Sequence, residues 1–485
     1  MSHFLINKEP FLISKELFLI SKELFLMNNG LFSYLTVAED QGMNILTVSK
    51  FHEVFMQKIM AESKNMTAAA TELTSSGLLQ VNVVNIENNF PIQNARVTIS
   101  ASLTPDNTLE EVTTDSSGQT EQIQLAAPPL DYSLEPGSSQ PYTDYNLVIT
   151  APGFKPVRID GTEILPDATA IQPVRMEPES DLMPTENPIV IPEHTLYGTY
   201  PPKIAEPEIQ PVGESGEIVL SRVVVPQTIV VHDGVPTDSS APDYYVPYRD
   251  YIKNVASSEI YATWPQSTIT ANVLAIMSFT LNRVYTEHYR NRGYDFTITS
   301  STAFDHKWIY GRNIYENISV TVDEIFDNYL SRPEVRQPIL TQYCDGRQVQ
   351  CLHRGWMTQW GSCSLGERGY SPIEILRNFY GESIYINTAE EISGIPASWP
   401  GYDLTIGASG QKVRQAQEQL DAIASVYTAI PHITPDGIYG PATAESVRQF
   451  QSIFGLPQTG VIDFATWYKI SHIYVAVSGI GELYG

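Results

Sequence analysis

Residues 436–451 read DGIYGPATAESVRQFQ, and this stretch decides the fold of the C-terminal part of the chain. The Asp-Gly pair and the second glycine are typical of tight turns, because glycine adopts backbone conformations closed to other residues. Thr443 then begins a predicted helix, in which Val447 and Phe450 lie three apart and face the core. Similar helical patterns with small loops surround it. We therefore predict a small all-α domain over residues 401–476.

The same domain resembles the peptidoglycan-binding module of wall hydrolases. The shared features occur in order: an Asp-Gly-x-x-Gly-x-x-Thr turn from Asp436, the pair Phe450-Gln451, and a closing Thr466-Trp467. The resemblance implies that residues 401–476 bind peptidoglycan. The alternative is a helical bundle with a purely structural role.

Upstream, residues 251–260 read YIKNVASSEI and come shortly before Pro265. Proline is favoured at the start of a helix and glycine at its end, so we predict a long helix from Pro265 to Gly293. Further patterns complete an α+β domain over residues 218–400. They predict helices over 248–261 and 320–330 and strands over 217–225 and 229–231.

This domain resembles the stage II sporulation protein D family, which are lytic transglycosylases of peptidoglycan. That family places one glutamate six residues before a helix-starting proline, here Glu259 and Pro265. Residues 355–362 and 369–381 resemble the family's closing motifs. From residue 40 to 485 the chain is similar to the spore cortex-lytic enzymes of spore-forming anaerobes. The resemblance implies spore cortex peptidoglycan as substrate and a zymogen that a protease activates during germination.

One glutamate is enough for this reaction, whereas ordinary glycosidases need two carboxylates. The muramoyl C6 hydroxyl is an internal nucleophile, so Glu259 can first protonate the glycosidic oxygen and then accept the hydroxyl's proton. The product is a 1,6-anhydro sugar. A proton donor near neutral pH needs a raised pKa, which burial provides. We expect Tyr261 and Trp264 to form apolar walls around this carboxyl.

Sugar sites use hydroxyls, amides and aromatic faces. The candidate substrate-binding residues with these groups are Ser301, Thr302, Tyr343, Gln359 and Trp360. For Trp360, a place in the hydrophobic core is an equal alternative.

Metal and cofactor binding are not expected. The family's basic residues after the proline fall at Thr270 and Met277 here, and the zinc ligands of some members have no match around residues 299–306. Cys344 and Cys351 leave open a metal site, a disulfide or free thiols. A structural metal site needs four ligands, and only His306 offers an obvious further one. We therefore favour a disulfide or simple packing, and predict no metal and no cofactor.

Residues 179–217 are expected to be an exposed, extended linker. Within residues 181–217 there are seven of the chain's 33 prolines and seven acidic residues, opposed only by Lys203. Such a segment is open to proteases, so we predict an activating cut between Asp181 and Glu217. The released enzyme would keep the catalytic and wall-binding domains.

The N-terminal part combines a leader and a β domain. From Leu78 the apolar residues alternate with polar ones, which predicts a β-sandwich over residues 77–178. It resembles the carboxypeptidase regulatory-like (transthyretin-like) module. Residues 1–76 form a leader with tandem heptad copies and one helix over 45–60, and residues 477–485 form a tail. The charges in the leader leave no secretion-signal core, so we expect the protein to be made without a secretion signal. The resemblance to the spore cortex-lytic enzymes implies a place in the cortex or coat region of the spore.

The composition limits the partners. The 485 residues carry 29 basic and 55 acidic side chains, a net charge of -26, which repels nucleic acid and anionic membranes. Two other functions remain as alternatives. One is an N-acetylmuramoyl-L-alanine amidase, although such enzymes are usually zinc-dependent. The other is a non-enzymatic wall-binding protein.

Overall fold

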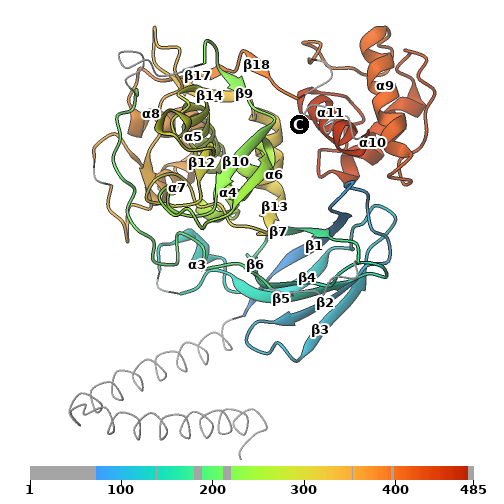
Figure 1. The fold of residues 1–485 in the computed structure, drawn as a ribbon, viewed down its shortest axis with the longest axis horizontal. Coiled ribbons are helices and arrows are strands. Elements are labelled where there is room, and N and C mark those ends of the chain that lie inside the picture. The colour runs from blue at the N-terminus through green and yellow to red at the C-terminus, as the bar shows by residue number, and fades with distance from the viewer. Residues whose placement is uncertain are drawn as a thin grey trace, which may run out of the picture. The chain divides into compact units, whose positions relative to one another are not determined.

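The computed structural model describes residues 73–137, 139–179, 188–210, 220–351, 353–394 and 398–478 (Figure 1). The heptad copies, the helix expected over 45–60 and most of the tail lie outside this part of the chain. Within it, no helix is long and apolar enough to cross a membrane.

The N-terminal domain consists of two sheets packed against each other. In β1, Leu79, Val81 and Val83 are fully buried and alternate with more exposed neighbours, as a strand with one face on a core requires. The elements are β1 Ser75–Asn85, β2 Arg96–Ala101, β3 Thr108–Thr113, β4 Ile123–Ala127, the short helix α3 Asp131–Leu134, β5 Thr143–Thr150, β6 Val157–Ile164 and β7 Thr169–Met176. The predicted strands are confirmed, while the transthyretin-like topology stays a prediction.

Both sheets of this domain continue into later parts of the chain. One sheet has the order β13-β7-β1-β4 and the other β3-β2-β5-β6-β8. Strand β8, Ile189–Val190, pairs with β6, and β13, Ile314–Tyr315, pairs with β7. Beside β13, the Arg312 guanidinium forms a two-pronged ion pair with Glu163 of β6, at 3.1 and 2.6 Å, and both side chains are buried. The N-terminal domain and the middle region, residues 220–394, therefore share a sheet and a hydrophobic core.

Helix α5, Gln266–Tyr285, is the central element of the middle region and contacts α4, α6, α7 and α8. Its residues from Ala271 to Arg283 are buried, as expected for a helix surrounded by others. The other helices are α4 Tyr248–Glu259, η1 Arg290–Arg292, α6 Glu316–Ile325, α7 Gln359–Glu367 and α8 Pro372–Tyr380. The strands are β9 Val224–Val225, β10 Thr228–His232, β11 Asp243–Pro247, β12 Ile298–Thr299, β14 Asn328–Ser331, β15 Tyr343–Cys344, β16 Met357–Thr358, β17 Tyr385–Thr388 and β18 Glu391–Ile392.

Three predictions in this region are wrong in extent. Of the strand expected over 217–225, only Val224–Val225 is a strand among the described residues 220–225. The long helix ends at Tyr285, not at Gly293, and Gly293 caps the separate turn η1 with a positive φ of 83°. The helix expected over 320–330 ends at Ile325. Its last residues instead form β14, which pairs with β17 and buries Tyr329 and Leu330. Apolar residues in so short a run fit a buried strand as well as a helix, and the partner strand decides between them.

The C-terminal domain contains α9 Gln411–Ala424, α10 Pro441–Ile453 and α11 Phe464–Ser478. Helix α10 begins two residues before the predicted Thr443. Val447 and Phe450 are fully buried in the core, as predicted. The all-α character expected for this domain is confirmed.

Two buried glutamines hold the loops of this domain in the same way. The Gln417 amide accepts the Gly437 N–H at 2.8 Å and donates to the Thr443 hydroxyl at 3.1 Å. Gln451 accepts the Gly460 N–H at 2.8 Å and donates to the Thr466 hydroxyl at 3.1 Å. Each glutamine thus clamps a glycine turn onto the helix that follows.

Helix α11 also contacts the middle region through buried charges. Lys469 of α11 lies 2.8 Å from the Asp323 carboxylate of α6, which also pairs with Arg249 and Lys253 of α4. Asp323 is fully buried, and its three cations hold the pKa of its carboxyl far below the usual range. This cluster joins three helices at one point.

Candidate active site

Glu259 is the last residue of α4, where the chain turns toward α5. Ile260 follows in an extended conformation, and Pro265 caps the start of α5. The turn is held by Trp264, whose indole N–H donates to the Ser133 carbonyl of α3 at 2.8 Å. The Glu259 side chain is only 4% exposed. The backbone on both sides of Glu259 is therefore held in place, and its carboxyl is buried.

The Glu259 carboxylate accepts two hydrogen bonds. The Lys307 backbone N–H donates to one oxygen at 2.8 Å. The Gln359 amide donates to the other at 3.2 Å and to the Glu259 carbonyl at 2.8 Å. Burial raises the pKa of the Glu259 carboxyl, against the lowering effects of the Lys203 ammonium and of these two donors. The net rise brings the carboxyl closer to the range in which it can donate a proton.

A small cavity of about 50 Å³ lies beside Glu259. Of the predicted substrate-binding residues, Thr302, Tyr343 and Gln359 line it. Gln359 holds the carboxylate as described, so its contact is with Glu259. The Tyr343 side chain is buried, and burial together with the negative charge of Glu259 raises the pKa of its hydroxyl.

Ser301 and Trp360 are not among the residues that line this cavity. The backbone carbonyl of Ser301 accepts hydrogen bonds from the Phe304 and Asp305 N–H groups in a turn. Trp360 packs against Trp264 and Tyr261, with ring centres 5.1 and 6.0 Å away. This aromatic cluster supports the turn after α4. The prediction that Tyr261 and Trp264 form the apolar walls around the Glu259 carboxyl is therefore wrong, because other side chains line the cavity.

The expectation of an exposed linker is wrong for residues 188–210. This segment packs against the middle region and contributes Thr195, Gly198, Tyr200, Pro201 and Lys203 to the cavity. Its apolar and aromatic residues, such as the buried Leu196, find partners there that composition alone does not reveal. Residues 180–187 and 211–219 lie outside the described part.

Lys203 is the site residue that sequence reasoning missed. Its ammonium lies over the rings of Phe279 and Tyr343, 5.4 and 5.0 Å from their centres, and burial lowers its pKa. It also donates to the backbone carbonyls of Thr302, at 3.3 Å, and Asp305. The sequence feature that could have pointed to it is that Lys203 is the only Lys or Arg among seven Asp and Glu residues in the range 181–217.

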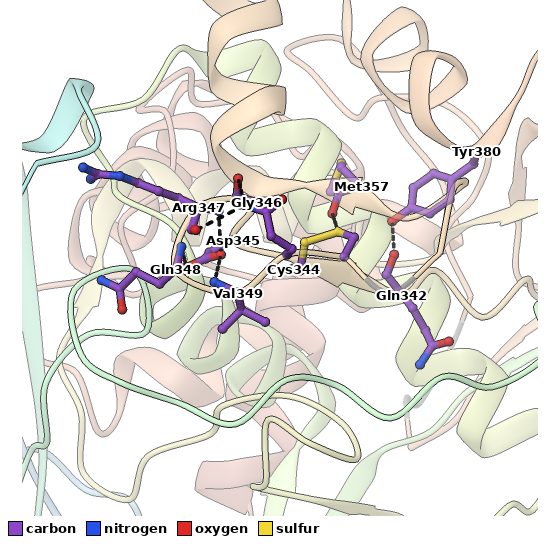
Figure 2. The surroundings of a disulfide bond; sticks show 11 residues. Gln342, Cys344, Asp345, Gly346, Arg347, Gln348, Val349, Met357 and Tyr380 are labelled. Carbon is purple, nitrogen blue, oxygen red and sulfur yellow. Dashed lines mark hydrogen bonds between the residues drawn. A yellow bond between two sulfur atoms is a disulfide. The ribbon is translucent and has the colours of Figure 1, made fainter.

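Cys344 and Cys351 form a disulfide that closes a loop beside the cavity (Figure 2). Inside the loop, the Asp345 carboxylate accepts the backbone N–H groups of Arg347, Gln348 and Val349 at 2.8–3.1 Å. Of the alternatives left open by the sequence, the disulfide is the one found. The third cysteine, Cys363, is a buried free thiol whose pKa burial raises to about 12.

In the parts of the chain that the structure describes, no three His, Cys, Asp or Glu side chains gather closely enough to hold a metal ion. His306 is buried next to the cavity, where its ring stacks on Tyr343 and hydrogen-bonds to the Tyr251 hydroxyl at 3.1 Å. Burial holds the pKa of His306 well below its usual value, so its imidazole is neutral.

Comparison with known families identifies the C-terminal domain. Residues 409–470 match the family described as "Putative peptidoglycan binding domain". The matched residues cover α9, α10 and the first half of α11, including both glutamine clamps. The chain has a C-terminal peptidoglycan-binding domain. The match supports the predicted role of this domain in binding peptidoglycan.

Other similarities are partial. The chain is 38% identical over 73 residues to the zinc D-Ala-D-Ala carboxypeptidase of Streptomyces albus G, covering 15% of this chain and about a quarter (27%) of that relative. Among solved structures, the Bacillus anthracis TIE protein is 15% identical over 21% of this chain and 17% of its own, with a TM-score of 0.15. The Klebsiella pneumoniae 5-hydroxyisourate hydrolase is 18% identical over 21% and 92%, also with a TM-score of 0.15.

Proposed function

We propose that this protein is a peptidoglycan lytic transglycosylase with Glu259 as its single acid and base. The observation that carries the proposal is the state of Glu259: a buried carboxyl with a raised pKa, held by two donors beside a cavity. The peptidoglycan-binding domain in the same chain supports a wall substrate. Similarity to a relative named as a D-Ala-D-Ala carboxypeptidase supports action on the wall.

In the proposed reaction, Glu259 begins protonated. It donates its proton to the glycosidic oxygen between the muramoyl and glucosaminyl sugars, and that C–O bond breaks. The resulting carboxylate then accepts the proton of the muramoyl C6 hydroxyl, while the oxygen of that hydroxyl forms a bond to C1 of the same sugar. No water enters the reaction. The Lys307 N–H and the Gln359 amide stabilise the carboxylate between the two steps and fix its direction.

We further propose that the natural substrate is spore cortex peptidoglycan and that the protein is a zymogen activated by a germination protease. These proposals rest on the similarity of the sequence to spore cortex-lytic enzymes. They place the protein in the cortex or coat region of the spore.

Mass spectrometry of cortex fragments tests the reaction. Purified cortex is digested with the protein after protease treatment, and the soluble fragments are analysed. Fragments ending in 1,6-anhydromuramic acid are expected. Loss of stem peptides from intact glycan would instead show an amidase, and unchanged glycan would show a binding protein without this activity.

A further inference from the structure

The segment 194–210 fills the space beside Glu259. The remaining cavity of about 50 Å³ is far below the roughly 300–1,000 Å³ of pockets that bind small molecules. A glycan strand is larger than such a molecule. In the chain as described, a sugar therefore cannot reach the carboxyl without displacing this segment.

Lys203 of this segment lines the cavity together with Glu259. The residue is only 6% exposed, and its ammonium uses polar and aromatic groups that suit a sugar. These are the Thr302 and Asp305 carbonyls, which accept its N–H groups, and the face of the Tyr343 ring. Carbonyl oxygens and an aromatic face equally suit the hydroxyls and the apolar face of an N-acetylated sugar. Lys203 also places a positive charge near Glu259, which opposes protonation of the acid.

Two ion pairs fasten the segment to the helices and loops around it. Glu206 pairs with Arg283, with an N–O distance of 2.5 Å, and Glu208 pairs with Arg332 at 2.7 and 2.8 Å. The buried Arg283 is also paired with Asp305 at 2.7 Å. Arg283 therefore keeps one carboxylate partner when the segment leaves, which lowers the electrostatic penalty of release.

We propose that residues 194–210 are an internal inhibitory strap that occupies the glycan-binding groove of Glu259, with Lys203 in the position of a sugar. The groove that the strap covers takes a glycan strand of N-acetylated hexosamines. This inference rests on the proposed function, because it assigns the regulation and ligand of the same site. It also changes what activation requires: the strap must leave the groove, and a cut in the chain beside it is not sufficient.

The test compares the uncut full chain with the strap variant Lys203→Ala/Glu206→Gln/Glu208→Gln. A milder variant, Glu208→Gln, loosens one anchor only. Lys155→Ala, which breaks the exposed pair with Glu177, is the matched control. We expect the strap variant to release anhydromuropeptides from cortex at least tenfold faster than the uncut parent, Glu208→Gln to lie between them, and the control to equal the parent. Melting temperatures establish that each variant is folded.

A binding measurement separates failure of the strap from failure of the proposed reaction. Both the parent and the strap variant are prepared with Glu259→Gln and mixed with the β-1,4-linked tetramer of N-acetylglucosamine. Hydrogen exchange then reports protection of residues 299–307 and 343–351, apart from any binding by the C-terminal domain. Stronger protection in the strap variant supports the strap.

If the strap variant gains protection but, with Glu259 intact, makes no anhydro product, the strap stands and the transglycosylase proposal is overturned. If the folded strap variant gains neither protection nor activity, the strap is overturned. The same holds if the uncut parent binds the tetramer as strongly as the variant does.

Discussion

The C-terminal domain and the cleft around Glu259, meaning the cavity beside this residue and the side chains that hold it, are built in opposite ways. In the C-terminal domain, the glutamine clamps join residues close in sequence: Gln451 bonds to Gly460 and Gln417 to Gly437. In the cleft, Glu259 bonds to Gln359 and Glu206 to Arg283, so the partners are 100 and 77 residues apart. The first region is specified by local patterns, and the second depends on the packing of several elements.

This difference predicts how each region responds to change. Damage to a local clamp should affect wall binding and leave the cleft intact. Damage to the cleft should affect catalysis and leave wall binding intact, unless the charge cluster at Asp323 transmits it between them.

The largest effect is expected from Glu259→Gln. Glutamine is nearly isosteric but cannot donate and then accept a proton, so anhydro product formation by the protease-treated protein should fall by about 10²- to 10⁴-fold. Sedimentation with insoluble cortex should not change. Glu382→Gln, at an exposed position, is the matched control and should keep full activity. Substantial activity in Glu259→Gln would remove this residue from the proposed mechanism.

Gln451→Ala should unfold the C-terminal domain more easily. The change leaves the Gly460 N–H, the Val461 carbonyl and the Thr466 hydroxyl without this partner, at a cost of about 2–4 kcal/mol in the free energy of unfolding. Urea unfolding measures the loss, and cosedimentation with cortex should weaken. Gln449→Ala on the same helix should cost less than about 0.5 kcal/mol. Equal stability of the two variants would contradict the clamp.

Removing the disulfide should affect the cleft alone. Cys344→Ser/Cys351→Ser frees the loop beside the cavity, and loop entropy predicts a loss of about 2.5 kcal/mol. A reducing agent should lower the melting temperature of the wild type to that of the variant and leave the variant unchanged. Cosedimentation with cortex should stay the same in both cases. If reduced wild type melts at its original temperature, the disulfide does not stabilise the cleft.

The smallest effect concerns pH and stability. The pKa of Glu259 is raised in the folded state, so that state holds its proton more tightly, and stability falls as pH rises from the unfolded pKa of about 4.3 through the folded value. Glu259→Gln removes this loss. Its melting temperature relative to wild type should therefore be higher at pH 7 than at pH 4, with the exposed Glu382→Gln showing no such change. A difference independent of pH would contradict the raised pKa.

The sequence predicted elements well where the pattern is local. The strands of the N-terminal domain and the core positions Val447 and Phe450 follow from spacing alone. Glu259 was found from its motif, and the structure places Tyr343, Thr302 and Gln359 near it. The role of Lys203 could not be predicted, because it depends on Phe279, Tyr343 and Asp305 coming together from distant positions. The composition of residues 188–210 indicates a solvated segment, and only tertiary contacts show that some of its side chains, such as Leu196 and Lys203, are buried.

The pairing of β13 with β7, together with the buried Glu163–Arg312 ion pair, has a consequence for the kinetics of activation. A protease that cuts after residue 210 leaves two polypeptides sharing one sheet, so the chain becomes a heterodimer. Separating them breaks the β13–β7 pairing and the Glu163–Arg312 ion pair, and exposes both charged side chains to water. For the proposed zymogen, the lag before cortex lysis would then depend on the rate at which the two polypeptides dissociate, and excess N-terminal fragment added in trans would lengthen it.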